Sequence, residues 1–168
     1  ALGVTQQLPT EDHYNLSKAY LMARLAVLLA GRTAEEIAIG EITTGAENDL
    51  IEATQLARKM VTRWGMGKLG LRAFRADEEH PFLGYELSRG KDYSESTAAI
   101  VDEEVKKLLD KSHETVHKIL VSNKEKLDAT VHLLLKDETI DSKELEKILG
   151  PRGLLKIVEK PKQNTNDI

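Results

Sequence analysis

The feature that most constrains the fold is a helix with one apolar face, predicted by residues 44–65. Thr44 stands three residues before Glu47, the spacing of a capping box, in which the hydroxyl accepts a first-turn N–H and the Glu side chain reaches back. At 100° per residue, a helix starting at Gly45 gathers one apolar set on a single face. The set is Ala46, Leu50, Ala53, Ala57, Met60, Val61 and Trp64. Gly65 then supplies a left-handed stop.

One acid lies at the edge of this apolar face. Asp49 falls beside Ala46, Ala53 and Leu56 when the helix is wound at 100° per residue. A carboxylate there is either a solvated residue at the rim, favoured by the helix dipole, or a group held at a wet cavity for a cation or a general-base task. The helical geometry leaves both interpretations open.

Two further helices are predicted before this one. Ser17 can cap a helix that runs to Ala30 and ends at Gly31. Its buried side would carry Leu21, Leu25, Leu28 and Leu29. Thr33 and Glu36 form a second capping box, which opens a short helix over 33–39 that Gly40 ends. In this interpretation Glu36 takes part in the cap and Glu35 is solvated.

The C-terminal part predicts three helices. A long one starts at Ser94, ends at Asn123 and carries an apolar stripe sustained over seven turns. The stripe is Ala98, Val101, Val105, Leu108, Ser112, Val116 and Ile119. A second helix with Leu127, Val131, Leu134 and Leu135 is expected to pack back as an αα-hairpin. Asp141 with Glu144 caps a third, which Gly150 and Pro151 stop.

The remaining segments are less regular. Leu2, Gly3, Val4 and Thr5 form a short apolar and β-branched run before Pro9, readable as one brief strand or as a frayed terminus. Residues 66–92 contain Gly67, Gly70, Gly84, Gly90 and Pro81, and predict a long exposed connection. We therefore expect a mainly α chain with one short N-terminal strand and a C-terminal helical bundle.

Composition narrows the classes of function. The 168 residues suffice for one domain with a core, and no cysteine is present for a disulfide, a thiolate site or a Cys nucleophile. A net charge of −4 gives no basic footprint for nucleic acid. The best apolar run, 21–30, contains Arg24 and is shorter than the roughly 20 residues that span a bilayer. We expect a soluble piece, and the lack of an initiating Met indicates that Ala1 is internal to something larger.

Three runs of residues carry a resemblance to a known family. They are L-x-G-R-x-A-E-E-I-x-x-G at 29–40, I-T-T-G-A-E-N-D-L at 42–50 and A-T-x-x-A-R-x-M-V-x-x-W-G-M at 53–66. Together they resemble the protease domain of the FtsH family of membrane-anchored AAA metalloproteases, and the similarity extends from Ala1 to Arg152. The Asp of T-G-A-x-N-D-L is that family's third zinc ligand, so the resemblance implies this role for Asp49.

The resemblance also implies what this chain lacks. In family members two His ligands and the catalytic Glu come from an H-E-A-G-H helix upstream of A-L-G-V-T, whereas this chain starts at Ala1. No catalytic residue is therefore expected here, and the chain alone should be inactive. The resemblance makes residues 2–5 the edge strand that binds substrate, and a Glu near Asp49, such as Glu36, could fix a metal ligand.

Domain organisation and biology follow as expectations from the resemblance. Residues 1–152 would be one helical peptidase-domain fragment, divided into a zinc-site half at 1–65, a connection at 66–92 and a helical bundle at 93–152, with a polar tail at 153–168. The parent would use zinc to hydrolyse unfolded and membrane polypeptides, with ATP and Mg²⁺ in a separate ATPase domain. It would be a homo-hexamer anchored in the membrane, its protease domain on the cytoplasmic side of a bacterial inner membrane or in an organelle equivalent.

Two other interpretations stay open. One is a non-catalytic helical assembly or adaptor module with a degenerate protease fold, which an upstream sequence lacking H-E-x-x-H would favour. The other is an independent zinc site, because His113, Glu114 and His117 form a literal H-E-x-x-H on a predicted helix. At 100° per residue both His flank the apolar stripe on the solvent side, and no H-x-x-G-x-x-H continuation follows. These surroundings therefore favour two solvated His side chains over a zinc site.

Overall fold

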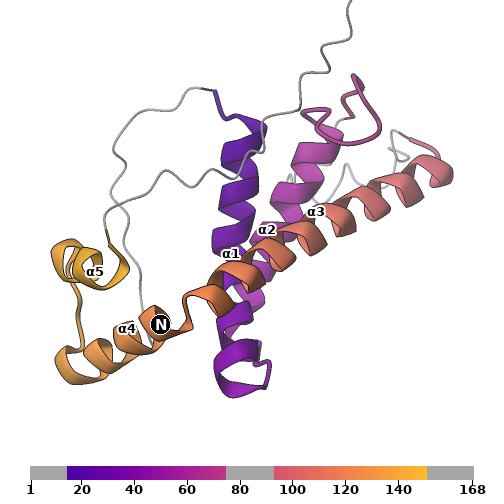
Figure 1. Ribbon diagram of the computed structural model, residues 1–168. Helices are drawn as coiled ribbons and strands as arrows, with labels where there is room; N and C mark the ends of the chain where they lie inside the picture. The colour runs from indigo at the N-terminus through magenta and orange to yellow at the C-terminus, as the bar shows by residue number, and fades with distance from the viewer. Residues whose placement is uncertain (1–14, 75–92, 151–168) are drawn as a thin grey trace, which may run out of the picture.

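The computed structural model describes residues 15–74 and 93–150, and this part of the chain is built from helices (Figure 1). They are α1 (Lys18–Ile39), the 3-10 turn η1 (Thr44–Ala46), α2 (Glu47–Thr62), α3 (Glu95–Ser122), α4 (Lys124–Asp137) and α5 (Ser142–Leu149). The predicted mainly α fold is confirmed. The strand predicted at 2–5 and the tail at 153–168 lie outside the described residues, as does most of the connection predicted at 66–92.

The core lies where α1, α2 and α3 pack against one another (Figure 1). Each helix contributes residues from the apolar stripe that its sequence predicts. These are Leu21, Leu25 and Leu29 of α1, Ala53, Ala57, Met60 and Val61 of α2, and Val101 and Val105 of α3. The alanines of α2 bring its backbone close to its neighbours, while the leucines of α1 fill the space between them. Burying each large side chain stabilises the fold by about 1.5–3 kcal/mol.

The structure corrects the predicted break in the first helix. Ser17 caps α1 as predicted, accepting the Tyr20 N–H, but the helix continues through Gly31 to Ile39. Thr33 is 0% exposed and its hydroxyl donates to the Leu29 carbonyl at 2.8 Å instead of capping a new helix. Burial of Leu29 and Thr33 holds the helix together across a glycine that disfavours it by about 1 kcal/mol.

Replacing Gly31 with alanine should therefore stabilise the protein. Gly31 is exposed within α1, and a Cβ added there meets no atom within 4 Å. We expect the free energy of unfolding to rise by about 0.4–1 kcal/mol, because the unfolded chain loses freedom. Urea denaturation measures this change. Gly40→Ala is the contrasting control, since Gly40 has φ 78° and its substitution should destabilise. A loss of stability in Gly31→Ala would contradict the continuous helix.

The C-terminal end of α2 matches the prediction, whereas the N-terminal end does not. Gly65 adopts φ 59° and the Met66 N–H donates to the Met60 carbonyl at 2.8 Å, so the predicted left-handed stop is confirmed. The predicted capping box of Thr44 and Glu47 is wrong. The side chain that caps is Thr43, which accepts the Gly45 N–H at 3.1 Å, and η1 precedes α2. Local spacing did not reveal that Thr43 has a partner on α1.

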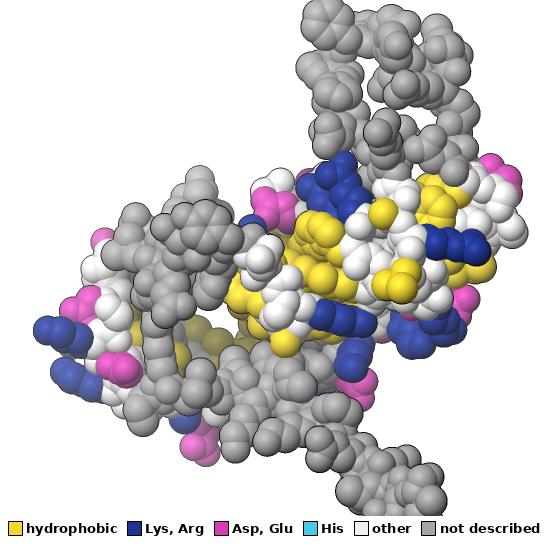
Figure 2. Space-filling model, turned by 90° about the horizontal axis from the view of Figure 1, so that it is seen from above, with side chains coloured by type: hydrophobic (Ala, Val, Ile, Leu, Met, Phe, Trp, Pro, Cys, Tyr) yellow, Lys and Arg dark blue, Asp and Glu magenta, His cyan; other side chains and the backbone are white. Residues whose placement is uncertain are grey.

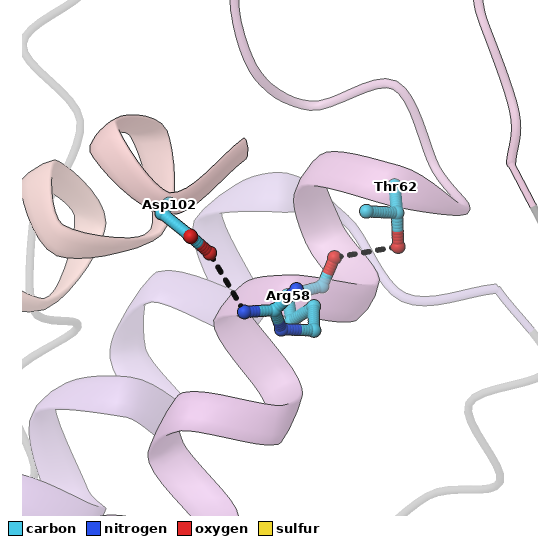
Figure 3. Close-up of polar contacts among 3 residues, drawn as sticks. All are labelled: Arg58, Thr62 and Asp102. Atoms are coloured by element: carbon cyan, nitrogen blue, oxygen red, sulfur yellow. Dashed lines mark hydrogen bonds and ion pairs between the residues drawn. The ribbon is translucent and has the colours of Figure 1, made fainter. Parts of the chain in front are cut away.

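Helix α3 matches its prediction and is joined to α2 mainly by apolar contact. Ser94 caps it and Asn123 ends it, as expected. On the surface between the two helices, Arg58 Nη2 lies 2.8 Å from Asp102 Oδ1 (Figure 3). These side chains are 43% and 65% exposed, so the pair contributes at most about 1 kcal/mol.

A buried carboxylate on α3 fixes the turn after α2. The Glu104 side chain is 9% exposed, and its Oε2 accepts the Lys68 N–H at 2.9 Å. The Lys68 ammonium lies 3.7 Å from Oε1 and balances part of the charge. The apolar pattern of α3 gave no sign of this residue. The contact holds the turn at residues 67–70 against the helix that starts at residue 95.

The predicted αα-hairpin differs from the structure. Figure 1 shows α4 leading away from the end of α3 instead of folding back beside it, and no residue of α4 is buried. Among the described helices α4 contacts only α3 and α5. The Lys126 ammonium donates to the Leu149 carbonyl at 2.8 Å, and the predicted capping box of Asp141 and Glu144 is confirmed.

Apolar side chains also reach the surface. In the view from above, hydrophobic side chains gather in the middle of the face, with Lys and Arg side chains beside them (Figure 2). Two residues of the predicted α2 stripe stay partly exposed, Leu50 at 39% and Trp64 at 45%. Among the described helices, none combines the length and apolarity that crossing a bilayer requires.

Candidate metal centre

Asp49 lies in the first turn of α2, where its carboxylate is exposed to solvent. Within the described ranges, no hydrogen bond or ion pair engages its side chain. The helix dipole favours an acid at this position. Helical geometry predicted a position at the edge of the apolar face, and the exposed carboxylate agrees with that position. Within the described ranges both oxygens are available to a ligand.

The turn before Asp49 is held by α1. Glu35 accepts the Thr43 backbone N–H at 3.3 Å, and both of its oxygens lie within 3.3 Å of the Thr43 hydroxyl. Thr43 in turn accepts the Gly45 N–H. The expectation that Glu35 is only solvated is therefore wrong. An acid that reaches eight residues ahead gives no periodic signal, which is why sequence analysis missed it.

Glu36 has a different partner from the predicted one. Instead of capping a helix, its Oε2 lies 3.3 Å from His113 Nε2 on α3. This contact links α1 to α3 at the surface, with side chains 44% and 43% exposed. The role of Glu36 in orienting a metal ligand stays a prediction.

Among the described residues, the H-E-x-x-H sequence on α3 has no third zinc ligand. The rings of His113 and His117 are 6.3 Å apart between centroids and tilted by 54°. Glu114 bonds Lys118 at 2.7 Å, and that hydrogen bond and the ammonium charge hold the pKa of the Glu114 carboxyl below its usual value. A carboxylate with a lowered pKa is a poorer general base. The described helices contain no group of three or more His, Cys, Asp or Glu side chains placed to hold a metal.

The donor chemistry nevertheless fits one ligand of a zinc centre. Zinc in proteins accepts Asp oxygens together with His nitrogens, and an exposed carboxylate on a rigid helix is such a donor. Asp49 meets these requirements, whereas the predicted strand residues 2–5 lie outside the described part of the chain. The described residues can thus supply one ligand but no complete set.

Tight zinc binding by this chain alone is therefore not expected. Among the described residues Asp49 has no imidazole partner, and one carboxylate is a weak site, so metal analysis after dialysis should find well below one zinc per chain. The variant His113→Ala with His117→Ala is the matched control and should give the same value. One zinc per chain that is lost in this variant would show that α3 carries a real site.

Comparison with known proteins shows which family and which relatives the chain resembles. Its residues 1–148 match the model of peptidase family M41. The ATP-dependent zinc metalloprotease FtsH of Nitrosococcus oceani is 50% identical over 149 residues, which are 88% of this chain and 23% of that protein. FtsH 3 of Petrotoga mobilis is 49% identical over 150 residues, 89% of this chain and 23% of the relative. FtsH 4 of Sorangium cellulosum is 46% identical over 156 residues, which are 92% of this chain and 24% of that protein.

The match explains the resemblance that the sequence motifs carry. The chain spans about a quarter of the length of these curated relatives. The family model covers most of the chain, including the run around Asp49 and the helices of the core. The chain therefore belongs to peptidase family M41.

Proposed function

We propose that this chain is part of the zinc metallopeptidase domain of an ATP-dependent, FtsH-like protease, and that Asp49 is its metal ligand. The observation that carries the proposal is the exposed carboxylate of Asp49 on the first turn of α2, which has no partner among the described residues and lies within the run I-T-T-G-A-E-N-D-L. The relatives that share half of the sequence are named zinc metalloproteases. The remaining ligands would be two His of an H-E-x-x-H helix upstream of Ala1.

The described residues would hold the metal in place and offset part of its charge. A zinc ion held there supplies an activated water and polarises the scissile carbonyl. Asp49 contributes a hard oxygen and one negative charge, and α2 holds it on a helix anchored in the core by Ala53 and Ala57. No described residue is assigned as the base. We assign that role to the Glu of the upstream helix, and residues 2–5 to the strand that binds substrate.

The larger setting belongs to the same proposal. The parent would degrade unfolded and membrane polypeptides, bind ATP and Mg²⁺ in a separate domain and assemble as a homo-hexamer. Its anchor would lie outside this chain, with the protease domain facing the cytoplasm of a bacterium or the equivalent organelle compartment. Residues 1–152 would form the peptidase-domain fragment and 153–168 its tail.

The test compares this chain with the parent protein, meaning a longer protein that carries this chain and its upstream sequence. We expect the parent to cleave unfolded casein with ATP, to lose cleavage with a chelator and to regain it with zinc. The 168-residue chain should cleave nothing. An upstream sequence without H-E-x-x-H, in a parent that is inactive with zinc and ATP, would instead favour the non-catalytic assembly module.

A further inference from the structure

The turn that leads to Asp49 is tied to α1 through one carboxylate. Thr43 contacts both oxygens of Glu35, with its backbone N–H at 3.3 Å from Oε2 and its hydroxyl at 3.2 Å from the same atom. The hydroxyl also accepts the Gly45 N–H at 3.1 Å. A hydroxyl donates one proton and accepts on its lone pairs, so all of these bonds form together. Glu35 thereby acts on Gly45 through Thr43.

The same turn sets where the helix bearing Asp49 begins. Gly45 is the central residue of η1, and the Glu47 N–H closes this turn by bonding the Thr44 carbonyl. Helix α2 follows directly at Glu47, and Asp49 is its third residue. No irregular segment separates the bonded turn from the acid. Ala46, the last residue of η1, is only 9% exposed, so the turn is also packed against the rest of the fold.

We propose that Glu35 is a positioning residue, which through Thr43 and Gly45 fixes the start of α2 and hence the place of Asp49. It would act without touching the Asp49 carboxylate, since its partners belong to the preceding turn. The inference rests on the proposed function, because zinc affinity matters only if Asp49 is a ligand. Replacing a residue that orients a metal ligand typically lowers metal affinity about 10-fold to 100-fold.

The matched pair of variants is Glu35→Ala and Glu52→Ala. Both acids lie on core helices, but Glu52 is exposed on α2, and within the described ranges no hydrogen bond or ion pair engages it. In the parent protein we expect Glu35→Ala to weaken zinc binding about 10-fold. In the 168-residue chain it should speed amide exchange at Gly45 about fivefold. Glu52→Ala should change neither quantity, and both variants should melt at nearly the same temperature.

Conservative variants separate positioning from general damage. Thr43→Ser keeps the hydroxyl and should bind zinc as the unaltered protein does, whereas Thr43→Val should match Glu35→Ala. Glu35→Gln keeps one acceptor and should recover part of the affinity. A Glu35→Ala protein with the zinc affinity and Gly45 exchange of Glu52→Ala would overturn the proposal. Faster exchange with unchanged zinc affinity would overturn it too.

Asp49→Asn, measured in parallel, distinguishes this failure from failure of the proposed function. If Asp49→Asn weakens zinc binding and Glu35→Ala does not, only the positioning role is wrong. If Asp49→Asn leaves zinc binding unchanged, the proposed function is wrong, and the positioning of a zinc ligand by Glu35 is overturned with it.

Discussion

Replacing Leu25 with alanine is expected to lower the free energy of unfolding by about 3 kcal/mol and the melting temperature by about 10 °C. Leu25 is 0% exposed and belongs to the cluster that joins α1, α2 and α3. Truncation removes apolar contacts and leaves a cavity, because helices packed on three sides relax only in part. Thermal unfolding followed by circular dichroism measures the change.

Val27→Ala is the matched control for this prediction. Val27 lies on the same helix but is 62% exposed, so its truncation should change stability by no more than about 0.5 kcal/mol. Similar melting temperatures for the two variants would contradict the core assigned to α1.

Replacing Asp49 with asparagine in the parent protein is expected to abolish function without unfolding the domain. Asn keeps the size and shape of Asp, and position 49 is exposed, so α2 and its packing should survive. Zinc affinity should fall by more than about 100-fold, beyond the loss typical of residues that only orient ligands. Proteolysis should fall with it, whereas ATP hydrolysis in another domain should stay nearly intact. Zinc content, casein cleavage and ATPase rate are measured together.

Two controls make this result specific to one carboxylate. Glu52→Gln removes an exposed acid from the next turn of α2 and should retain zinc and cleavage. His113→Ala removes the imidazole that contacts Glu36 and should leave cleavage unchanged. An Asp49→Asn protein that cleaves casein at the normal rate would remove Asp49 from the proposed site.

Signals carried by neighbouring residues predicted the fold well. Ser94 and Asn123 bound α3 as expected, and Asp141 with Glu144 closes the predicted box, because a cap depends only on residues within one turn. The stripe of α2 also reached the core, since Ala53, Ala57 and Met60 are all fully buried. Helical period and caps depend on the local sequence, so the folded protein keeps the elements that they predict.

Features set by tertiary contact could not be predicted in this way. Gly31 looked like a stop, yet packing of Leu29 and Thr33 carries α1 through it. The bond from Glu35 to Thr43 depends on how the chain turns after Gly40, which no periodicity encodes. The course of α4 depends on partners that its own apolar residues do not specify.

The candidate site was predicted only in part. Helical geometry placed Asp49 at the edge of the apolar face, where the structure finds it exposed, but left open whether it serves a metal. The metal role came from the resemblance, because a ligand set spread over distant segments has no local pattern. The family match supports the proposal without testing the residue.

The most direct measurement is zinc-edge anomalous diffraction from crystals of the parent protein. The proposed function predicts one zinc peak per protomer, about 2.0–2.2 Å from an Asp49 carboxylate oxygen. A zinc peak away from Asp49, for example between His113 and His117 on α3, would contradict it.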